Sequence, residues 1–93
     1  MASYEELLRQ GQTAIRNMDA QTKQHMRRRL QRYEGLLDDP KALQKTLDRL
    51  DPITIRRVEA TLGVRVSKAD LRVMDAATLA RLAKRLKAQL DQA

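Results

Sequence analysis

The sequence contains no cysteine, tryptophan or phenylalanine, and its aromatic residues are limited to Tyr4 and Tyr33. Without cysteine, disulfides and thiolate metal sites are excluded, which agrees with a reducing compartment such as the cytoplasm. No apolar run approaches the roughly 18 residues of a membrane span, and the first residues lack the pattern of a secretory signal peptide. We therefore expect a soluble cytoplasmic protein that makes no membrane contact.

The apolar residues are almost all Leu, Ile, Val, Met and Ala, and a chain of 93 residues fits one small domain over residues 1–93. Small aliphatic side chains without large rings favour helix-on-helix packing. The sequence therefore predicts an all-α fold, a compact bundle of four or five helices with a long N-terminal helix.

Five places in the sequence have the residues of a helix start. A Ser or Asp side chain can accept a hydrogen bond from a free backbone N–H, and proline is tolerated in the first turn because its missing N–H would have no helical partner. These starts are Ser3 with Glu6, Asp39 with Pro40, Asp51 with Pro52, Ser67 with Asp70, and Asp75. Apolar pairs that can pack as hydrophobic staples bracket three of them: Leu50 with Ile55, Val66 with Leu71, and Met74 with Leu79.

The first helix is expected to run from about Tyr4 to Leu37. Its apolar positions are Leu8, Ile15, Met18, Met26, Leu30, Tyr33 and Leu37. This helix has two weak points, Gly11 and residues 17–20. Glycine in a helix interior costs about 1 kcal/mol relative to alanine. The alternative is therefore that the segment forms two helices. Further helices are expected over residues 41–50, 52–62, 68–73 and 76–90, with Gly63 as a left-handed cap before a short extended link at residues 64–66.

Catalytic and metal-binding groups are scarce. His25 is the only histidine, so no second imidazole or thiolate is available to share a metal ion. Ser3 and Ser67 are already explained as helix caps, and the three glycines lie too far apart to form a phosphate-binding loop. We expect no enzymatic activity, no cofactor and no metal.

Basic residues are the remaining unexplained feature, since 19 Lys and Arg against 12 Asp and Glu give a net charge of +7. This balance favours a polyanionic or acidic partner. The densest cluster is Lys23, Arg27, Arg28, Arg29 and Arg32. On a helix, Arg28 and Arg32 share one side, whereas Lys23 and Arg27 share another. An ordinary solvated helix face explains the cluster about as well as a binding surface does.

Two further basic groups lie in the C-terminal half. Residues 55–74 weakly resemble a helix-turn-helix, which would place Arg65, Lys68 and Arg72 at the start of its second helix. Glu59 occupies a position that is usually small, however, and ordinary helix–loop–helix packing explains the segment better. Arg81, Lys84 and Arg85 lie on the last helix, which has no acidic residue between Ala76 and Leu90.

These observations lead to two functional hypotheses. The first is a small non-enzymatic regulator that binds nucleic acid mainly through phosphate contacts from the three basic groups. The alternative is an adaptor or inhibitor that docks on an acidic surface of a partner protein. A third, weaker hypothesis is self-association through the long apolar stripe of the first helix.

Overall fold

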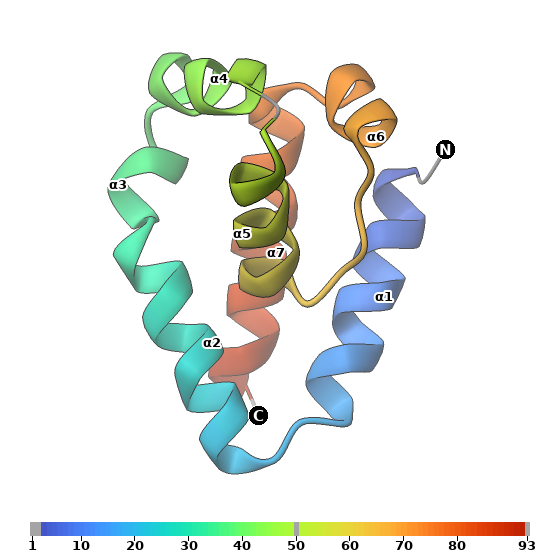
Figure 1. The fold of residues 1–93 in the computed structure, drawn as a ribbon. Coiled ribbons are helices and arrows are strands. Elements are labelled where there is room, and N and C mark those ends of the chain that lie inside the picture. Colours follow the sequence, from blue (N-terminus) through green and yellow to red (C-terminus); the bar gives the residue numbers. More distant parts are fainter. Residues whose placement is uncertain (1–2, 50, 93) are drawn as a thin grey trace.

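The computed structural model describes residues 3–49 and 51–92, and all regular structure within these ranges is helical. Seven helices follow one another: α1 (Tyr4–Arg16), α2 (Ala20–Arg32), α3 (Glu34–Leu37), α4 (Pro40–Arg49), α5 (Pro52–Leu62), α6 (Lys68–Val73) and α7 (Ala76–Gln92). They form a compact globule with a radius of gyration of 12.3 Å (Figure 1). The all-α prediction is confirmed.

Helix α7 is the structural centre of the fold. Helix α1 lies beside it and runs in the same direction, whereas α2 and α3 lie on its other side and run in the opposite direction (Figure 1). The contacts that fix these directions join Tyr4 to Arg81, Gln12 to Gln89, Arg27 to Leu90 and Asp38 to Lys84. The apolar side of α7 is buried as predicted, and it consists of Leu79, Leu82, Ala83, Leu86 and Leu90.

The prediction of a four- or five-helix bundle with a long N-terminal helix is wrong. The segment expected as one helix is interrupted at residues 17–19, where the chain reverses direction between α1 and α2. Asp19 adopts extended backbone angles and its carboxylate accepts the N–H of Thr22 at 2.7 Å. A local side-chain hydrogen bond of this kind competes with helix continuation, so the weak point at residues 17–20 is a real break.

A smaller irregularity separates α2 from α3 at Tyr33, whose backbone angles of φ −95° and ψ 7° leave the helical region. The hydrogen bonds from Tyr33 N–H to the Arg29 carbonyl and from Leu37 N–H to the Tyr33 carbonyl still link the two helices. Helix α3 therefore continues α2 after a kink. After this kink, α3 packs against α4.

Helices α1 and α7 form the most extensive helix–helix contact among the described residues. The buried line of α1 is Leu7, Gly11 and Ile15. The prediction placed Leu8 in this line, but Leu7 is fully buried and Leu8 only partly so, because packing against α7 sets the rotation of the helix. Gly11 permits the approach, since a Cβ there would lie 2.7 Å from the methyl carbons of Leu86.

The predicted helix starts are present. The Ser3 hydroxyl accepts the Glu6 N–H, Asp39 accepts the Ala42 N–H, Asp51 accepts the Thr54 N–H, Asp75 accepts the Thr78 N–H, and Ser67 and Asp70 form a reciprocal capping box. Val66, Leu71, Met74 and Leu79 are all buried, as two of the staples require. The third staple includes Leu50, which lies outside the described residues.

The link between α5 and α6 is held in place by Gly63 and Glu59. Gly63 has a left-handed φ of 68° and ends α5 as predicted. The Glu59 carboxylate then accepts the N–H of Val66 at 3.2 Å, and Val64 and Val66 are buried. The link thus carries apolar side chains into the core without forming a strand.

Candidate functional site

The carboxylates of this protein are turned toward its own backbone and its own cations. Every aspartate forms a hydrogen bond or an ion pair within the chain: Asp19, Asp39, Asp51, Asp70 and Asp75 at helix starts, Asp48 with Gln44, Asp38 with Lys84, and Asp91 with Arg27. Most of the acidic residues are therefore occupied locally. The basic residues outnumber them and supply the exposed charge.

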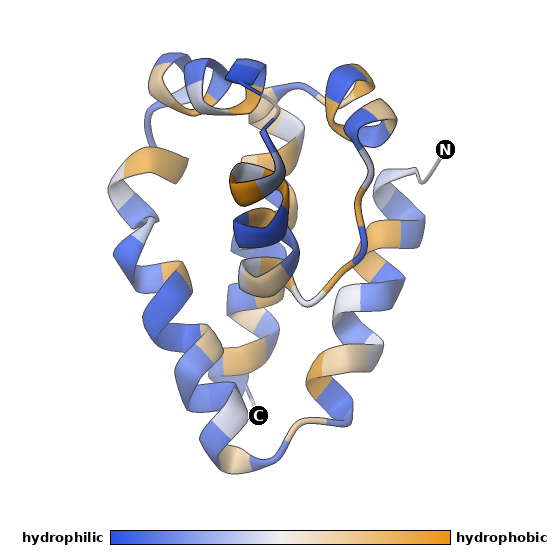
Figure 2. Ribbon diagram, in the orientation of Figure 1, coloured by the Kyte–Doolittle hydropathy of each residue, from blue (hydrophilic) through white to orange (hydrophobic). Residues whose placement is uncertain are grey.

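Helix α2 carries the densest group of basic residues in the sequence. It contains Lys23 and four arginines but no acidic residue, and most of its length is hydrophilic (Figure 2). Arg28 and Arg32 are exposed and make no hydrogen bond or ion pair with any residue in the described ranges. Because they lie one turn apart, their guanidinium groups project from the same side of the helix.

The other basic residues of α2 divide between its two flanks. Arg27 turns toward α7, where it donates to the Leu90 carbonyl and lies 3.8 Å from the Asp91 carboxylate. Arg29 turns the other way and donates to the carbonyl of Ala60 on α5 at 3.4 Å. Of the five predicted residues in this cluster, Arg27 therefore has a structural role, Lys23 is half-buried, and Arg28, Arg29 and Arg32 are exposed.

The predicted basic face of α7 is largely engaged within the chain. The Arg81 guanidinium lies 4.5 Å from the centre of the Tyr4 ring. The Lys84 ammonium is 3.0 Å from the Asp38 carboxylate, and the Lys87 ammonium is 3.9 Å from the Glu34 carboxylate. These contacts attach α7 to α1 on one side and to α3 on the other, so Arg85 is the predicted α7 residue without such a contact among the described residues.

Arg65, Lys68 and Arg72 are exposed on the link and on α6, away from the α2 cluster (Figure 1). Helix α6 has six residues and ends at Met74, whose backbone is extended. A helix of this length spans only about 9 Å, which agrees with ordinary helix–loop–helix packing. The three predicted basic groups therefore do not form one continuous surface.

Two arginines that sequence reasoning did not select, Arg56 and Arg57, are exposed on α5, the helix that Arg29 of the α2 cluster contacts. Arg57 is close enough to Asp51 to lower the pKa of that carboxyl, as is Arg49 at the end of α4, although the hydrogen bond from the Thr54 N–H has the larger effect. Arg29, at the Ala60 carbonyl, extends this positive region along α5. The pair Arg56-Arg57 in the sequence was the available signal, but α2 and α5 are far apart in the chain.

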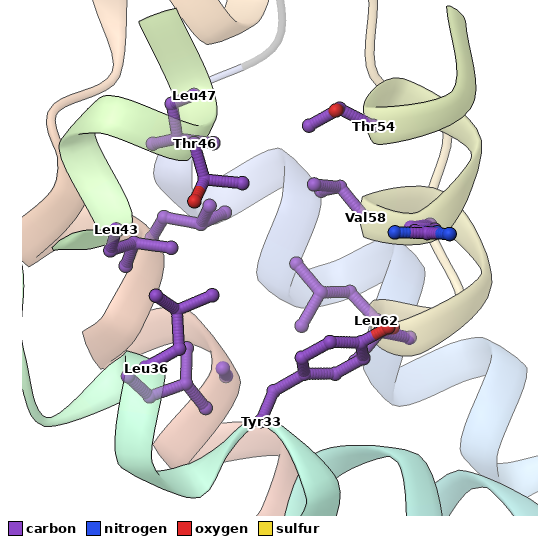
Figure 3. Close-up of a pocket in the computed structure, with 13 residues that line it drawn as sticks. Tyr33, Leu36, Leu43, Thr46, Leu47, Thr54, Val58 and Leu62 are labelled. Carbon is purple, nitrogen blue, oxygen red and sulfur yellow. The ribbon is translucent and has the colours of Figure 1, made fainter. Parts of the chain in front are cut away.

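An apolar pocket of about 110 Å³ opens between α3, α4 and α5, with α7 as its floor (Figure 3). Buried aliphatic residues form its walls and floor, among them Leu43 of α4, Leu62 of α5 and Leu79 of α7. Thr46 on α4 and Thr54 on α5 lie across from each other at one end, and Tyr33 points in from the α2–α3 kink at the other. Arg57 is the charged residue of the lining.

His25, the only histidine, is exposed. Within residues 3–49 and 51–92, no group of three or more histidine, aspartate or glutamate side chains is placed to hold a metal ion. No helix in this part of the chain is long and apolar enough to cross a membrane. Comparisons of the chain with models of known protein families, with characterised proteins and with solved structures found no match.

Proposed function

We propose that this protein is a small non-enzymatic, cytoplasmic regulator that binds nucleic acid through phosphate contacts. The observation that supports this most directly is the exposed surface of α2, where Arg28 and Arg32 have no carboxylate partner in the described chain. Arg29, Arg56 and Arg57 widen the surface toward α5. Arginine suits phosphate because its planar guanidinium can donate two parallel hydrogen bonds.

The binding is expected to depend on charge and not on base sequence. Two tyrosines on different helices form no stacking platform for unpaired bases. Phosphate contacts release condensed counterions, so affinity should fall steeply as salt rises. Duplex DNA and duplex RNA of any sequence are therefore suitable probes.

The experiment is a fluorescence anisotropy titration of labelled duplexes of about 20 base pairs, starting near 50 mM salt, where phosphate contacts are strong. The double variant Arg28→Ala/Arg32→Ala should bind more weakly, and on DNA its plot of log affinity against log salt should be shallower by about 2, or roughly 0.9 for each lost phosphate contact. Absence of binding to both duplexes under these conditions contradicts the proposal.

The matched control is Lys41→Ala/Lys45→Ala on α4. These lysines are exposed, lie one turn apart like Arg28 and Arg32, and make no hydrogen bond or ion pair with another described residue. The control removes the same net charge from a different surface. Equal losses of affinity in both double variants would show that total charge, and not the α2 surface, determines binding.

The second candidate function is docking on an acidic surface of a partner protein, and the apolar pocket beside Arg57 favours it. A surface that combines an apolar recess with arginines matches the composition of many protein interfaces. Purification with and without nuclease separates the two candidates, since a stoichiometric protein partner that survives nuclease supports docking. Self-association stays a third, weaker hypothesis; the apolar stripe on which it was based is divided between α1 and α2.

A further inference from the structure

We propose that the pocket between α3, α4 and α5 receives a leucine or phenylalanine side chain from an acidic amphipathic helix of a partner protein. The inference rests on the second candidate function and specifies its partner. It does not depend on the nucleic-acid proposal.

The size of the pocket supports an anchoring side chain as its occupant. Its volume is about 110 Å³. Sites for drug-sized ligands and cofactors are typically about 300–1,000 Å³, whereas an apolar protein cavity of about 150 Å³ accommodates a single benzene molecule. One leucine side chain or one phenyl ring is therefore the size of group that this recess can hold.

The pocket is open because the side chains around its rim are short. Thr46 and Thr54 contribute small side chains where α4 faces α5, and Val58 does the same further along α5 (Figure 3). Leu36 and Val58 are only partly buried, although both pack against the core. A visiting apolar side chain would cover these groups and would contact the buried floor.

The charges around the pocket define the chemistry of the partner. Arg57 is part of the lining, and both Arg57 and Arg49 are near enough to Asp51 to influence its carboxyl. Arg29 of α2 donates a hydrogen bond to the carbonyl of Ala60, which lies one turn after Arg57 on α5. Acidic residues on either side of the anchor would find cations there, while basic residues would be repelled.

The form of the partner follows from the fold. Strand addition needs a sheet edge, and the described chain has no strand. An amphipathic helix that places its apolar side on a groove is the recognition mode left to a helical surface. Ile53 extends the apolar area on that side of α5, since it precedes Arg57 by one turn and is 63% exposed.

The probe for the test is a fluorescein-labelled helical peptide of about 18 residues, with leucines along one side and glutamates at the other positions. A second peptide has glutamine in place of leucine, and a third has lysine in place of glutamate. We expect the acidic leucine peptide to bind at least about 10-fold more tightly than either of the others, because both the anchor and the charge are needed. It should shift the amide NMR signals of Tyr33, Thr46 and Thr61, which line the pocket.

The protein variants are chosen so that a loss of folding cannot explain the result. Thr46→Leu and Thr61→Leu each fill the pocket from within, so the thermal transition should stay or rise while peptide affinity falls at least about 10-fold. Arg57→Gln should weaken the binding of the acidic peptide, because it removes a positive charge without filling the pocket. Lys45→Ala, on the exposed side of α4, is the control that should retain affinity.

Each outcome has a distinct meaning. Equal binding of the glutamate peptides with and without leucine would overturn the pocket inference while leaving an acidic partner possible. Absence of binding by every acidic peptide would overturn the inference, whereas the second candidate function is decided separately by the purification with and without nuclease. Unchanged affinity in folded Thr46→Leu and Thr61→Leu would also overturn the inference. Saturable binding of decanoate without binding of any peptide would overturn it in favour of a small amphipathic ligand.

Discussion

Gly11 of α1 faces Leu86 of α7 so closely that a Cβ on Gly11 would lie 2.7 Å from both terminal methyl carbons of Leu86. Leu86 is fully buried and cannot move aside easily. In a free helix, alanine is favoured over glycine by about 1 kcal/mol. Here we expect Gly11→Ala to lower the free energy of unfolding by about 1–3 kcal/mol, the usual effect of overpacking, as measured by urea denaturation.

The control for this prediction is Gly35→Ala in α3. A Cβ at Gly35 would meet nothing within 4 Å, and its φ is not positive. That substitution should raise the free energy of unfolding by about 0.5–1 kcal/mol. If Gly11→Ala stabilised the protein as Gly35→Ala does, the close packing of α1 on α7 would be contradicted.

Another residue at position 63 would be strained by the backbone conformation that Gly63 adopts, and not by a lack of room for a side chain. Its φ is 68°, while a Cβ there would make ordinary contacts of 3.4 Å with Ala14 and 3.6 Å with Met18. Gly63→Ala should therefore cost about 1–2 kcal/mol, the price of a left-handed residue, and Gly63→Asn should cost less because asparagine tolerates this region. Thermal unfolding of the two variants gives the order, and a larger loss for asparagine would contradict this explanation.

Arg27 attaches α2 to the C-terminal turn of α7 through the Leu90 carbonyl and Asp91. Arg27→Ala should lower the free energy of unfolding by about 1–2 kcal/mol, because the carbonyl loses a charged donor. Hydrogen exchange should accelerate over residues 87–92. Arg28→Ala removes the same charge from an exposed neighbour. It should leave the free energy of unfolding within about 0.5 kcal/mol of the parent protein and should not change the hydrogen exchange of residues 87–92.

Three N-cap aspartates make the fold sensitive to acid. The Thr22 N–H lowers the pKa of Asp19, the Thr54 N–H that of Asp51, and the Thr78 hydroxyl that of Asp75, all below the usual 3.8. Each carboxylate therefore stabilises the folded chain above pH 3.8, and this contribution is lost as the pH falls through the lower folded-state pKa.

The corresponding measurement is the thermal midpoint between pH 6 and pH 2 for the parent and for Asp19→Asn. Asparagine caps a helix about as well as aspartate but does not titrate. The thermal midpoint of the variant should match that of the parent at neutral pH and fall less in acid. Identical acid profiles would show that this cap does not contribute to the pH dependence.

Local chemistry in the sequence predicted most helix boundaries, because a cap and its target lie three residues apart. The starts at Ser67, Asp51 and Asp75 are of this kind. Residues 17–20 were recognised as a weak point, but Asp19 was missed as a cap because no proline or staple marks it, and its extended backbone shows that the helix ends there. The choice of Leu7 over Leu8 was equally hidden, because α7, distant in sequence, decides which side of α1 faces inward.

The candidate site was predictable in composition but not in arrangement. The α2 cluster was found because its residues are contiguous, and Arg28, Arg29 and Arg32 are exposed as a binding surface requires. Arg57 was not found, since its proximity to the apolar pocket depends on how α4 and α5 are placed. The engagement of Arg81 with Tyr4 was also invisible, because it joins the two ends of the described chain.

The central position of α7 has a consequence for folding during translation. Gln12 and Gln89 are hydrogen-bonded although they are 77 positions apart. Leu7 and Ile15 leave the ribosome before α7, which is translated last of the described helices. The apolar side of α1 therefore has no α7 to pack against until that helix has emerged, and the core closes only then.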